Sequence, residues 1–396
     1  MYIHKYITMS FSPDQRRAYD AVLRGKNIFL TGPGGCGKSW WIQHVYKTLP
    51  KRVHVCAMTG CAALLLQCNA KTVHSWAGIG LGDMKKALTN PYTVKRWKAT
   101  DVLIIDEVSM MSIELFEMLN EVGKSIRRSP LPFGGIQVIF CGDFYQLPPI
   151  QSGFCFESPL WDTVFHEHIV LSTIFRQKTE SFQKVLSEIR SGTLSYENNM
   201  LLRTRILEGG DCVKLVPTRR AADVINTTQY AELTGPEKVF TMKTTGMAAA
   251  IDYLRKNLLC SERLLLKVGC KVMCIANLNE NLCNGSQGTV IGFDPYPVVR
   301  FSTFETMVQP HVWTSDTASV TQIPLIHAWA LTIHKAQGAT LESAEIDLGN
   351  GIFECGQIYV GLSRLTCLEG LYLTAFNSSK IKSHPKVVDF YKKISS

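Results

Sequence analysis

The stretch GPGGCGKS at residues 32–39 decides the fold of this chain. It follows the apolar run NIFL at residues 27–30 and precedes a stretch, from Trp40 onward, that we predict to be helical. Glycines let a loop between a strand and a helix turn its backbone N–H groups toward phosphate oxygens, and the helix N-terminus adds positive partial charge. The stretch therefore predicts a site for a nucleoside triphosphate.

The side chains of this loop have distinct expected roles. The glycines allow phosphate to approach the backbone closely. Lys38 would reach the outer phosphates, and Ser39 would bind Mg²⁺. An ordinary glycine-rich turn is the alternative, but the strand before the loop and the helix after it favour the nucleotide site. The four glycines are Gly32, Gly34, Gly35 and Gly37.

Cys36 lies inside the loop, two residues before Lys38. The helix end and the nearby ammonium would favour its thiolate, which would then be reactive and lie beside the nucleotide. Alternatively, the side chain points into the sheet as a small buried hydrophobe. The sequence leaves both possibilities open.

Length and composition indicate a globular protein. The 396 residues suffice for two or three domains, and 46% hydrophobic with 19% charged residues argues against a disordered chain. A net charge of +9 favours a polyanionic partner such as nucleic acid, although an excess of lysine can also form a merely solvated surface.

The 13 cysteines are scattered, and none form a Cys-x-x-Cys pair. Cys270 and Cys274 come closest, but they lie in an alternating stretch that predicts a strand, which favours buried thiols over zinc ligands. We therefore expect no structural zinc and a reducing, intracellular compartment. Residues 1–11 lack the apolar core of a secretory signal, and no run of about eighteen apolar residues predicts a membrane span.

Apolar runs alternate with helical stretches through the first part of the chain, which predicts an α/β fold. After one run, Asp106 would bind Mg²⁺ and Glu107 would activate the attacking water, unless the pair is only an acidic strand cap. After another run, which ends at Asp143, Gln146 would hydrogen-bond the terminal phosphate, although a loop glutamine is usually only solvated. The runs are residues 27–30, 52–58, 101–107 and 137–143.

Six motifs occur in an order that resembles the superfamily 1 helicases. The chain is most similar to their PIF-type (petite integration frequency) branch, close to RecD, from about Ser12 to Leu373, and residues 171–192 resemble that branch's own signature segment. The resemblance implies two RecA-like P-loop domains with parallel sheets. The motifs are GPGGCGKS (32–39), DE (106–107), GDFYQLPPI (142–150), FRQ (175–177), TIHKAQGAT (332–340) and YVGLSR (359–364).

The resemblance also implies an ATP site with Mg²⁺. Gln15 matches a glutamine that reads adenine, and Gly338 is expected to contact the nucleotide. Arg176 and Arg364 match two arginines that the second domain directs at the γ-phosphate, where a guanidinium stabilises developing charge. The other ATPase residues that the resemblance implies are Lys38, Ser39, Asp106, Glu107 and Gln146.

Three further segments match those that hold single-stranded DNA in the family. Hydroxyls, imidazoles and backbone amides suit a translocating motor because they hold phosphate without reading bases. The histidines could instead be buried structural residues. The expected contacts are Thr59, Thr72, His74, Ser75, Thr332, His334 and Lys335.

The resemblance implies a domain organisation as well. We expect a first RecA-like domain over residues 1–165, with a short basic and aromatic insertion at about 82–99 that would split the duplex or be a solvated loop. The second RecA-like domain would cover 166–396. Its SH3-like β insertion would run over about 236–322, where residues 281–293 are typical of short turns between strands.

The implied function is that of an ATP-dependent 5′-to-3′ DNA helicase, which would unwind forked or duplex DNA in replication, recombination, repair or genome maintenance. One alternative is a helicase of RNA or RNA–DNA hybrids. Another is an ATP-switched DNA-binding clamp or loader that does not unwind. Ring-type loaders borrow an arginine from a neighbouring subunit, whereas Arg176 and Arg364 follow the loop in the same chain, so we expect a monomer. A nuclear location, or another site of DNA replication, is compatible with the sequence, in which no targeting signal is recognised.

Overall fold

The computed structural model describes residues 11–80, 82–210, 212–276, 278–279, 282, 284–301, 304–315 and 317–395. Most of the amino-terminal stretch at 1–11, together with residues 281 and 283 of the predicted turn segment, lies outside this range. Across the described ranges, no helix is both long and apolar enough to cross a bilayer.

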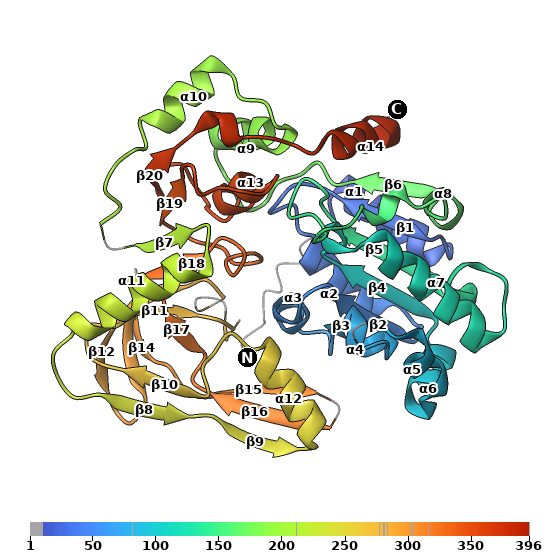
Figure 1. The fold of residues 1–396 in the computed structure, drawn as a ribbon, viewed down its shortest axis with the longest axis horizontal. Coiled ribbons are helices and arrows are strands. Elements are labelled where there is room, and N and C mark those ends of the chain that lie inside the picture. The colour runs from blue at the N-terminus through green and yellow to red at the C-terminus, as the bar shows by residue number, and fades with distance from the viewer. Residues whose placement is uncertain are drawn as a thin grey trace, which may run out of the picture.

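A six-stranded parallel sheet in the order β3-β2-β4-β5-β1-β6 forms the first half of the molecule (Figure 1). Its central strands are buried along their whole length, as the continuous apolar runs predict for a sheet covered on both faces. The strands are β1 (Ile28–Thr31), β2 (Val53–Ala57), β3 (Lys71–Thr72), β4 (Val102–Asp106), β5 (Gln137–Gly142) and β6 (Glu167–Val170).

Helices surround this sheet. The helix after the phosphate-binding loop begins at Lys38, two residues before the expected start, because Gly37 takes the left-handed conformation (φ 83°) at its N-cap. The α-helices are α1 (Pro13–Leu23), α2 (Lys38–Thr48), α3 (Gly60–Leu65), α4 (Val73–Ala77), α7 (Ile113–Arg127) and α8 (Trp161–Val164). Short 3₁₀ turns are η1 (Val108–Met110), η2 (Pro132–Gly135), η3 (Cys155–Glu157) and η4 (Ser378–Lys380).

A short helical hairpin occupies the basic and aromatic insertion, where α5 (Met84–Thr89) and α6 (Pro91–Ala99) meet at Asn90. The solvated-loop alternative is therefore wrong. Trp97 does not face solvent, because it is fully buried and its ring lies 4.6 Å from that of Trp76. Tyr92, by contrast, is 82% exposed.

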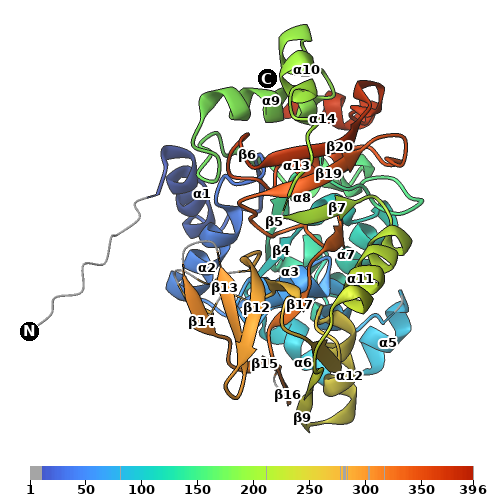
Figure 2. The same cartoon turned by 90° about the vertical axis from the view of Figure 1, so that its left-hand side faces the viewer.

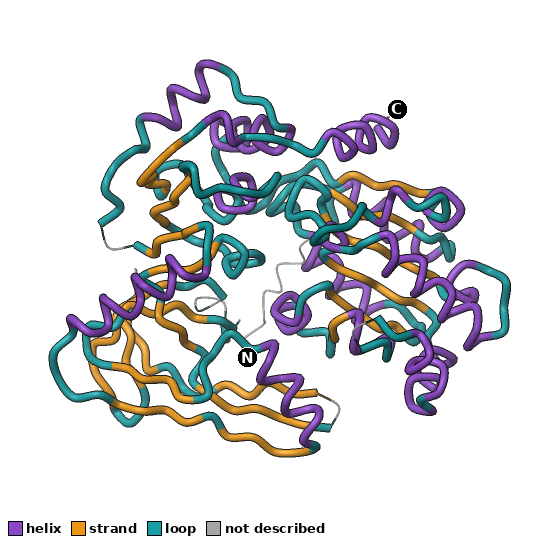
Figure 3. Tube along the Cα trace, viewed as in Figure 1, coloured by secondary structure: helices purple, strands orange, loops and turns teal. Residues whose placement is uncertain are grey.

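A second parallel sheet has the order β18-β7-β19-β20. Figures 1 and 3 show it above a β-rich region and beside the first sheet. Its strands are β7 (Val213–Val216), β18 (Ala330–Thr332), β19 (Ala344–Leu348) and β20 (Leu371–Phe376). Its helices are α9 (Glu180–Ser191), α10 (Tyr196–Arg203), α11 (Arg219–Glu232) and α13 (Gln357–Leu362).

The β-rich region is antiparallel and lies between β7 and β18 in the chain (Figure 2). A five-stranded sheet, a three-stranded sheet and a strand pair make it up, and α12 (Ala248–Asn257) packs on the three-stranded sheet. Cys270 and Cys274 are buried in its core, as predicted. The strands are β8 (Lys238–Thr241), β9 (Lys243–Gly246), β10 (Arg263–Leu266), β11 (Lys271–Cys274), β12 (Gln287–Phe293), β13 (Pro297–Phe301), β14 (Glu305–Met307), β15 (His311–Ser315), β16 (Ala318–Gln322) and β17 (Leu325–His327).

The last described helix, α14 (Pro385–Ser395), follows the second sheet in the chain but packs against the first. Its Phe390 ring lies 4.3 Å from that of Phe156 and 5.7 Å from that of Trp161. Figure 1 shows α14 in dark red beside the first half of the molecule. The chain thus returns to its first core after completing the second.

Candidate nucleotide site

Three strand ends of the first sheet meet at the candidate site. β5 lies between β4 and β1, and all three are parallel, so their carboxyl ends lie at one edge. β1 leads into the phosphate-binding loop, β4 ends at Asp106, and Asp143 follows β5. The edge therefore brings together the loop, the acidic pair and the segment that contains Gln146.

The glycines of the loop are required by packing as well as by backbone conformation. A Cβ added to Gly32, whose φ is 154°, would lie 2.7 Å from the carbonyl oxygen of Leu171. A Cβ on Gly35, whose φ is 86°, would lie 2.5 Å from the Cβ of Arg176. Because the segment after β6 presses on the loop at both points, any larger residue would push the two apart.

Lys38 is folded onto its own loop. Its Nζ donates to the carbonyl oxygens of Gly32 (2.6 Å) and Pro33 (3.1 Å), and the sulfur of Cys36 is 3.5 Å away. Burial lowers the pKa of Lys38, but Cys36 and the nearby carboxylates outweigh burial, so the pKa lies above its ordinary value. Cys36 itself is fully buried in the core, which agrees with the buried-hydrophobe alternative.

Gln15 and Ser39 flank the loop on two helices. Gln15 is buried at the first turn of α1, where it forms a capping box with Ser12, and its Nε2 donates to the carbonyl oxygen of Cys36 (3.4 Å). Ser39 is exposed in the first turn of α2. The amide of Gln15 is thus held against the loop backbone, whereas the hydroxyl of Ser39 is open to solvent.

Asp106 is buried and Glu107 is partly buried, and their environment disfavours the charged form of both carboxylates. Burial and then the charge of Glu107 raise the pKa of Asp106 to about 7, and burial also raises the pKa of Glu107. The backbone of Glu107 is left-handed, with a φ of 56°. This conformation is unfavourable for a residue with a side chain, and such strained residues occur preferentially at functional sites. A bound divalent cation would offset the burial and mutual repulsion of the two carboxylates, and the carboxylate of Asp106 and hydroxyl of Ser39 are the hard oxygen donors that Mg²⁺ prefers.

Gln337, which the sequence did not single out, bridges the two domains at this site. Its Nε2 lies 3.0 Å from Oε2 of Glu107 and 3.4 Å from Oε1 of Gln146. Gln337 lies in the TIHKAQGAT motif, which is recognisable in the sequence. Only the fold shows that Gln337 is the side chain of this motif that contacts Glu107 and Gln146. Its neighbour Gly338 is exposed, and a Cβ there would lie 3.2 Å from Leu65 in α3, outside the loop.

The Gln337→Ala substitution is expected to lower the kcat of ATP hydrolysis about tenfold, because a hydrogen bond to a charged group at the reacting edge is lost. Steady-state ATPase assays with saturating DNA test this. Gln229→Ala, which removes a similar amide-to-carboxylate bond to Glu232 on the surface of α11, is the matched control. Equal rates for the two variants would contradict a role for the bridge.

Both predicted arginines lie at the loop. The backbone N–H of Arg176 donates to the carbonyl oxygen of Gly35, and its guanidinium donates to that of Ser363 (2.8 Å). Arg364 is 3% exposed, and its guanidinium nitrogen Nη2 lies 3.5 Å from a Cβ built on Gly34. Burial, then the neighbouring Arg364, lowers the pKa of Arg176 to about 9, and burial lowers the pKa of Arg364. The guanidinium groups of Arg176 and Arg364 therefore lie close enough to repel each other, and a bound anion would offset this repulsion.

The predicted DNA contacts lie elsewhere, at helix starts and turns. The hydroxyls of Thr59, Thr72 and Thr332 each accept the backbone N–H of the residue three positions further on. This capping is how the sequence starts a helix or turn there and orients its first N–H groups. The other predicted contacts differ in exposure: His74 is half-buried, and burial lowers its pKa, whereas Ser75, His334 and Lys335 are exposed.

Thr72 also meets the antiparallel region. Its backbone N–H donates to the hydroxyl of Tyr253 in α12, over 2.8 Å. The antiparallel region therefore touches the first half of the molecule at one of the predicted DNA contacts.

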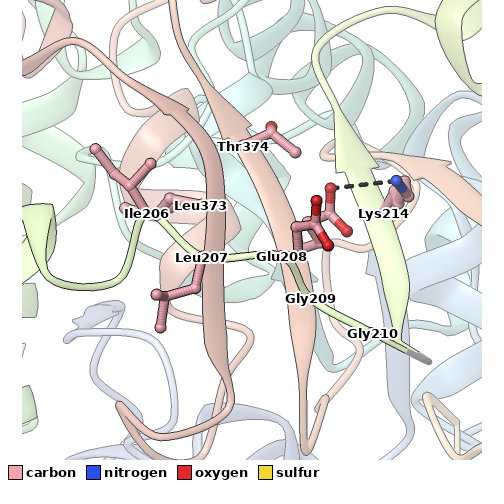
Figure 4. A pocket seen from close by; sticks show the side chains of 9 residues that line it. Ile206, Leu207, Glu208, Gly209, Gly210, Lys214, Leu373 and Thr374 are labelled. Atoms are coloured by element: carbon pink, nitrogen blue, oxygen red, sulfur yellow. Dashed lines mark ion pairs between the residues drawn. The ribbon is translucent and has the colours of Figure 1, made fainter.

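A pocket of about 570 Å³ lies apart from this site, at the beginnings of β7 and β19 (Figure 4). Lys214 and Glu345 form an ion pair there, with 3.2 Å between Nζ and Oε1. The nucleotide site lies at the carboxyl ends of its strands, whereas this pocket lies at the amino ends of β7 and β19, so the pocket is not part of the nucleotide site.

The two parallel sheets, the phosphate-binding loop and the arginines at the loop define a P-loop NTPase with two RecA-like domains. The model of the PIF1-like helicase family matches residues 10–200, and that of the 2B domain of DNA helicase Pif1 matches residues 251–293. The chain belongs to the PIF1-like helicase family. The family and the fold class predicted from the sequence are thereby confirmed.

One relative and two solved structures illustrate the relationship. An ATP-dependent DNA helicase Pif1 of Bdellovibrio bacteriovorus is 34% identical over 97% of this chain and 92% of its own. Pif1 of Bacteroides in complex with ADP-AlF4 has a TM-score of 0.85 and 25% identity, over 98% of this chain and 97% of that one. Bacteroides Pif1 bound to single-stranded DNA has a TM-score of 0.68 and 26% identity, over 97% of each chain. The chain spans only 56–64% of the length of its fungal and vertebrate relatives.

Proposed function

We propose that this chain is an ATP-dependent DNA helicase that moves 5′ to 3′ along single strands and unwinds duplex DNA. The observation that carries this proposal is the closure of the loop by the second RecA-like domain. The hydroxyl of Tyr359 accepts the N–H of Gly34 (2.8 Å), while Arg364 and Gln337 reach the same edge. A nucleotide at this edge would tie the two domains together, and hydrolysis would release them.

The chemistry follows from the groups at the strand ends. We propose that Lys38 leaves its loop carbonyls to pair with the phosphates, that Glu107 accepts a proton from the attacking water, and that Gln146 senses the terminal phosphate. Arg176 and Arg364 would stabilise charge on the transferred group. Mg²⁺, held by Ser39 and through water by Asp106, would supply further positive charge to the phosphates. The remaining cradle would be formed by Gln15, Gly32, Gly34, Gly35 and Gly37. Cys36 is buried in the core, and Gly338 lies against Leu65, so the cradle does not include them.

We propose that DNA lies across the helix starts and turns that carry the predicted contacts. The net charge of +9 and the oriented N–H groups at Thr59, Thr72 and Thr332 support this path. The similar Bacteroides protein with bound single-stranded DNA supports the substrate class. The exposed Tyr92 and the basic surface of α5 and α6 support a role for this hairpin at the fork.

Unwinding of duplexes with a 5′ tail is expected to exceed unwinding of 3′-tailed duplexes by at least about tenfold, since a translocating motor loads on one strand in one direction. Strand-separation assays with matched tails measure this. An RNA tail in the same assay tests the RNA or hybrid alternative. Equal unwinding from both tails would refute the polarity.

An ATP-switched clamp or loader is disfavoured because the arginines at the loop come from the same chain. We propose a monomer, whose ATPase rate per molecule does not depend on protein concentration. We also propose a reducing compartment at a site of DNA replication, a location that the free, buried thiols of Cys36, Cys56, Cys141 and Cys155 support.

A further inference from the structure

A buried polar cluster joins α14 to the nucleotide site. We call Thr31, Asp143, Arg190 and Tyr391 the Tyr391 cluster. The hydroxyl of Tyr391 lies 2.6 Å from Oγ1 of Thr31 and 3.2 Å from Oδ1 of Asp143. It also accepts the backbone N–H of Phe144 over 3.2 Å. One hydroxyl thus contacts the ends of two neighbouring strands, β1 and β5.

Arg190 completes the cluster from α9 of the second domain. Its guanidinium binds both carboxylate oxygens of Asp143, at 2.8 and 2.9 Å. The same guanidinium lies over the ring of Tyr391 (5.0 Å) and over that of Tyr145 (4.4 Å), and these two rings stack at 4.7 Å. Burial lowers the pKa of Arg190, but Asp143 outweighs it and raises the pKa overall. Such a bidentate, desolvated pair fixes the geometry of its partners.

The cluster lies directly behind the reacting groups. Thr31 is the last residue of β1 and immediately precedes Gly32. Asp143 is fully buried, and its carbonyl oxygen accepts the N–H of Gln146 (2.9 Å). With both carboxylate oxygens already engaged and its side chain sealed from solvent, Asp143 supports its neighbours and offers no oxygen to a ligand.

We propose that Tyr391 is a positioning residue for ATP hydrolysis, which holds the loop and the Gln146 segment in register through Thr31 and Asp143. This inference rests on the proposed function. The residues that Tyr391 hydrogen-bonds are not themselves expected to touch the nucleotide, but they lead into two elements that are. Loss of the hydroxyl therefore misplaces reacting groups more than it weakens nucleotide binding.

The test is Tyr391→Phe, which removes one oxygen and keeps the stacked ring. The kcat of DNA-stimulated ATP hydrolysis is expected to fall about tenfold, while the KM for ATP changes less than about twofold. Thr31→Val removes the other hydroxyl. If both act through one contact, the double variant is expected to be about as slow as the slower single variant, because coupled groups are not additive.

Two controls separate positioning from loss of stability. Phe390→Leu weakens the packing of the same helix without removing a polar contact, so it is expected to lower Tm and to keep kcat at permissive temperature. Tyr19→Phe removes a hydroxyl that contacts Oγ1 of Thr48 on the surface of the same domain and is expected to change neither. A Tyr391→Phe variant with wild-type kcat overturns this inference, as does a kcat loss matched by Phe390→Leu. Absence of ATPase activity in the wild-type chain overturns the proposed function instead.

Discussion

Glu107→Gln is expected to retain ATP and DNA binding while the ATPase rate falls by about two to four orders of magnitude. The reason is chemical: the amide keeps the size and the hydrogen-bonding position beside Gln337 but cannot accept a proton from water. Rapid-mixing ATPase assays measure turnover, and titration with a fluorescent ATP analogue measures binding.

Two control variants for Glu107→Gln change a surface carboxylate and the loop ammonium. Glu121→Gln, which alters an exposed ion pair with Lys124, is expected to leave turnover unchanged. Lys38→Ala is expected to lose nucleotide affinity as well as turnover, because we propose that its ammonium pairs with the phosphates. Hydrolysis by Glu107→Gln at near the wild-type rate would show that another group activates the water.

Arg364→Ala is expected to lower kcat by about a thousandfold, since a buried guanidinium that reaches the phosphates is worth that much in related phosphoryl-transfer enzymes. DNA affinity without nucleotide, and its dependence on salt, are expected to stay the same because no contact to a DNA phosphate is removed. Arg176→Ala is expected to behave alike. Fluorescence anisotropy with a labelled single strand at several salt concentrations measures both quantities.

Arg52→Ala is the matched control for the arginines, because its side chain is 65% exposed and pairs with Asp101 on the surface. It is expected to leave kcat unchanged. A large loss of nucleotide-free DNA affinity in Arg364→Ala or Arg176→Ala would instead assign that arginine to the DNA path.

Local sequence patterns were sufficient for four of the six strands of the first sheet, β1, β2, β4 and β5, and for the loop, but not for β3 and β6. The strands before Gly32 and Glu107 are apolar up to their last residues, Thr31 and Asp106, and a continuous apolar run is how a strand buried on both faces is recognised without knowing its neighbours. The loop itself has a pattern that few other structures require. These strands and the loop can therefore be recognised from their own residues alone.

The cross-chain contacts could not be predicted in the same way. Thr31 and Tyr391 are 360 residues apart, and an aromatic residue in an amphipathic helix is ordinarily a core residue. Gln337 was part of a recognised motif, but only the packing of two domains shows that it meets Glu107. The basic and aromatic composition of the insertion does not reveal that Trp97 is buried against Trp76. Side-chain direction depends on tertiary neighbours that no local pattern contains.

The return of α14 to the first core means that the backbone crosses between the two domains twice, once after β6 and once after η4. A domain held by a single linker can twist as well as tilt, but two covalent crossings leave mainly rotation about the line that joins them. The two crossings therefore define an axis about which one domain can rotate relative to the other. One crossing, the segment that carries Arg176, lies against the phosphate-binding loop, so a displacement of that loop would act directly on the line about which the domains can rotate.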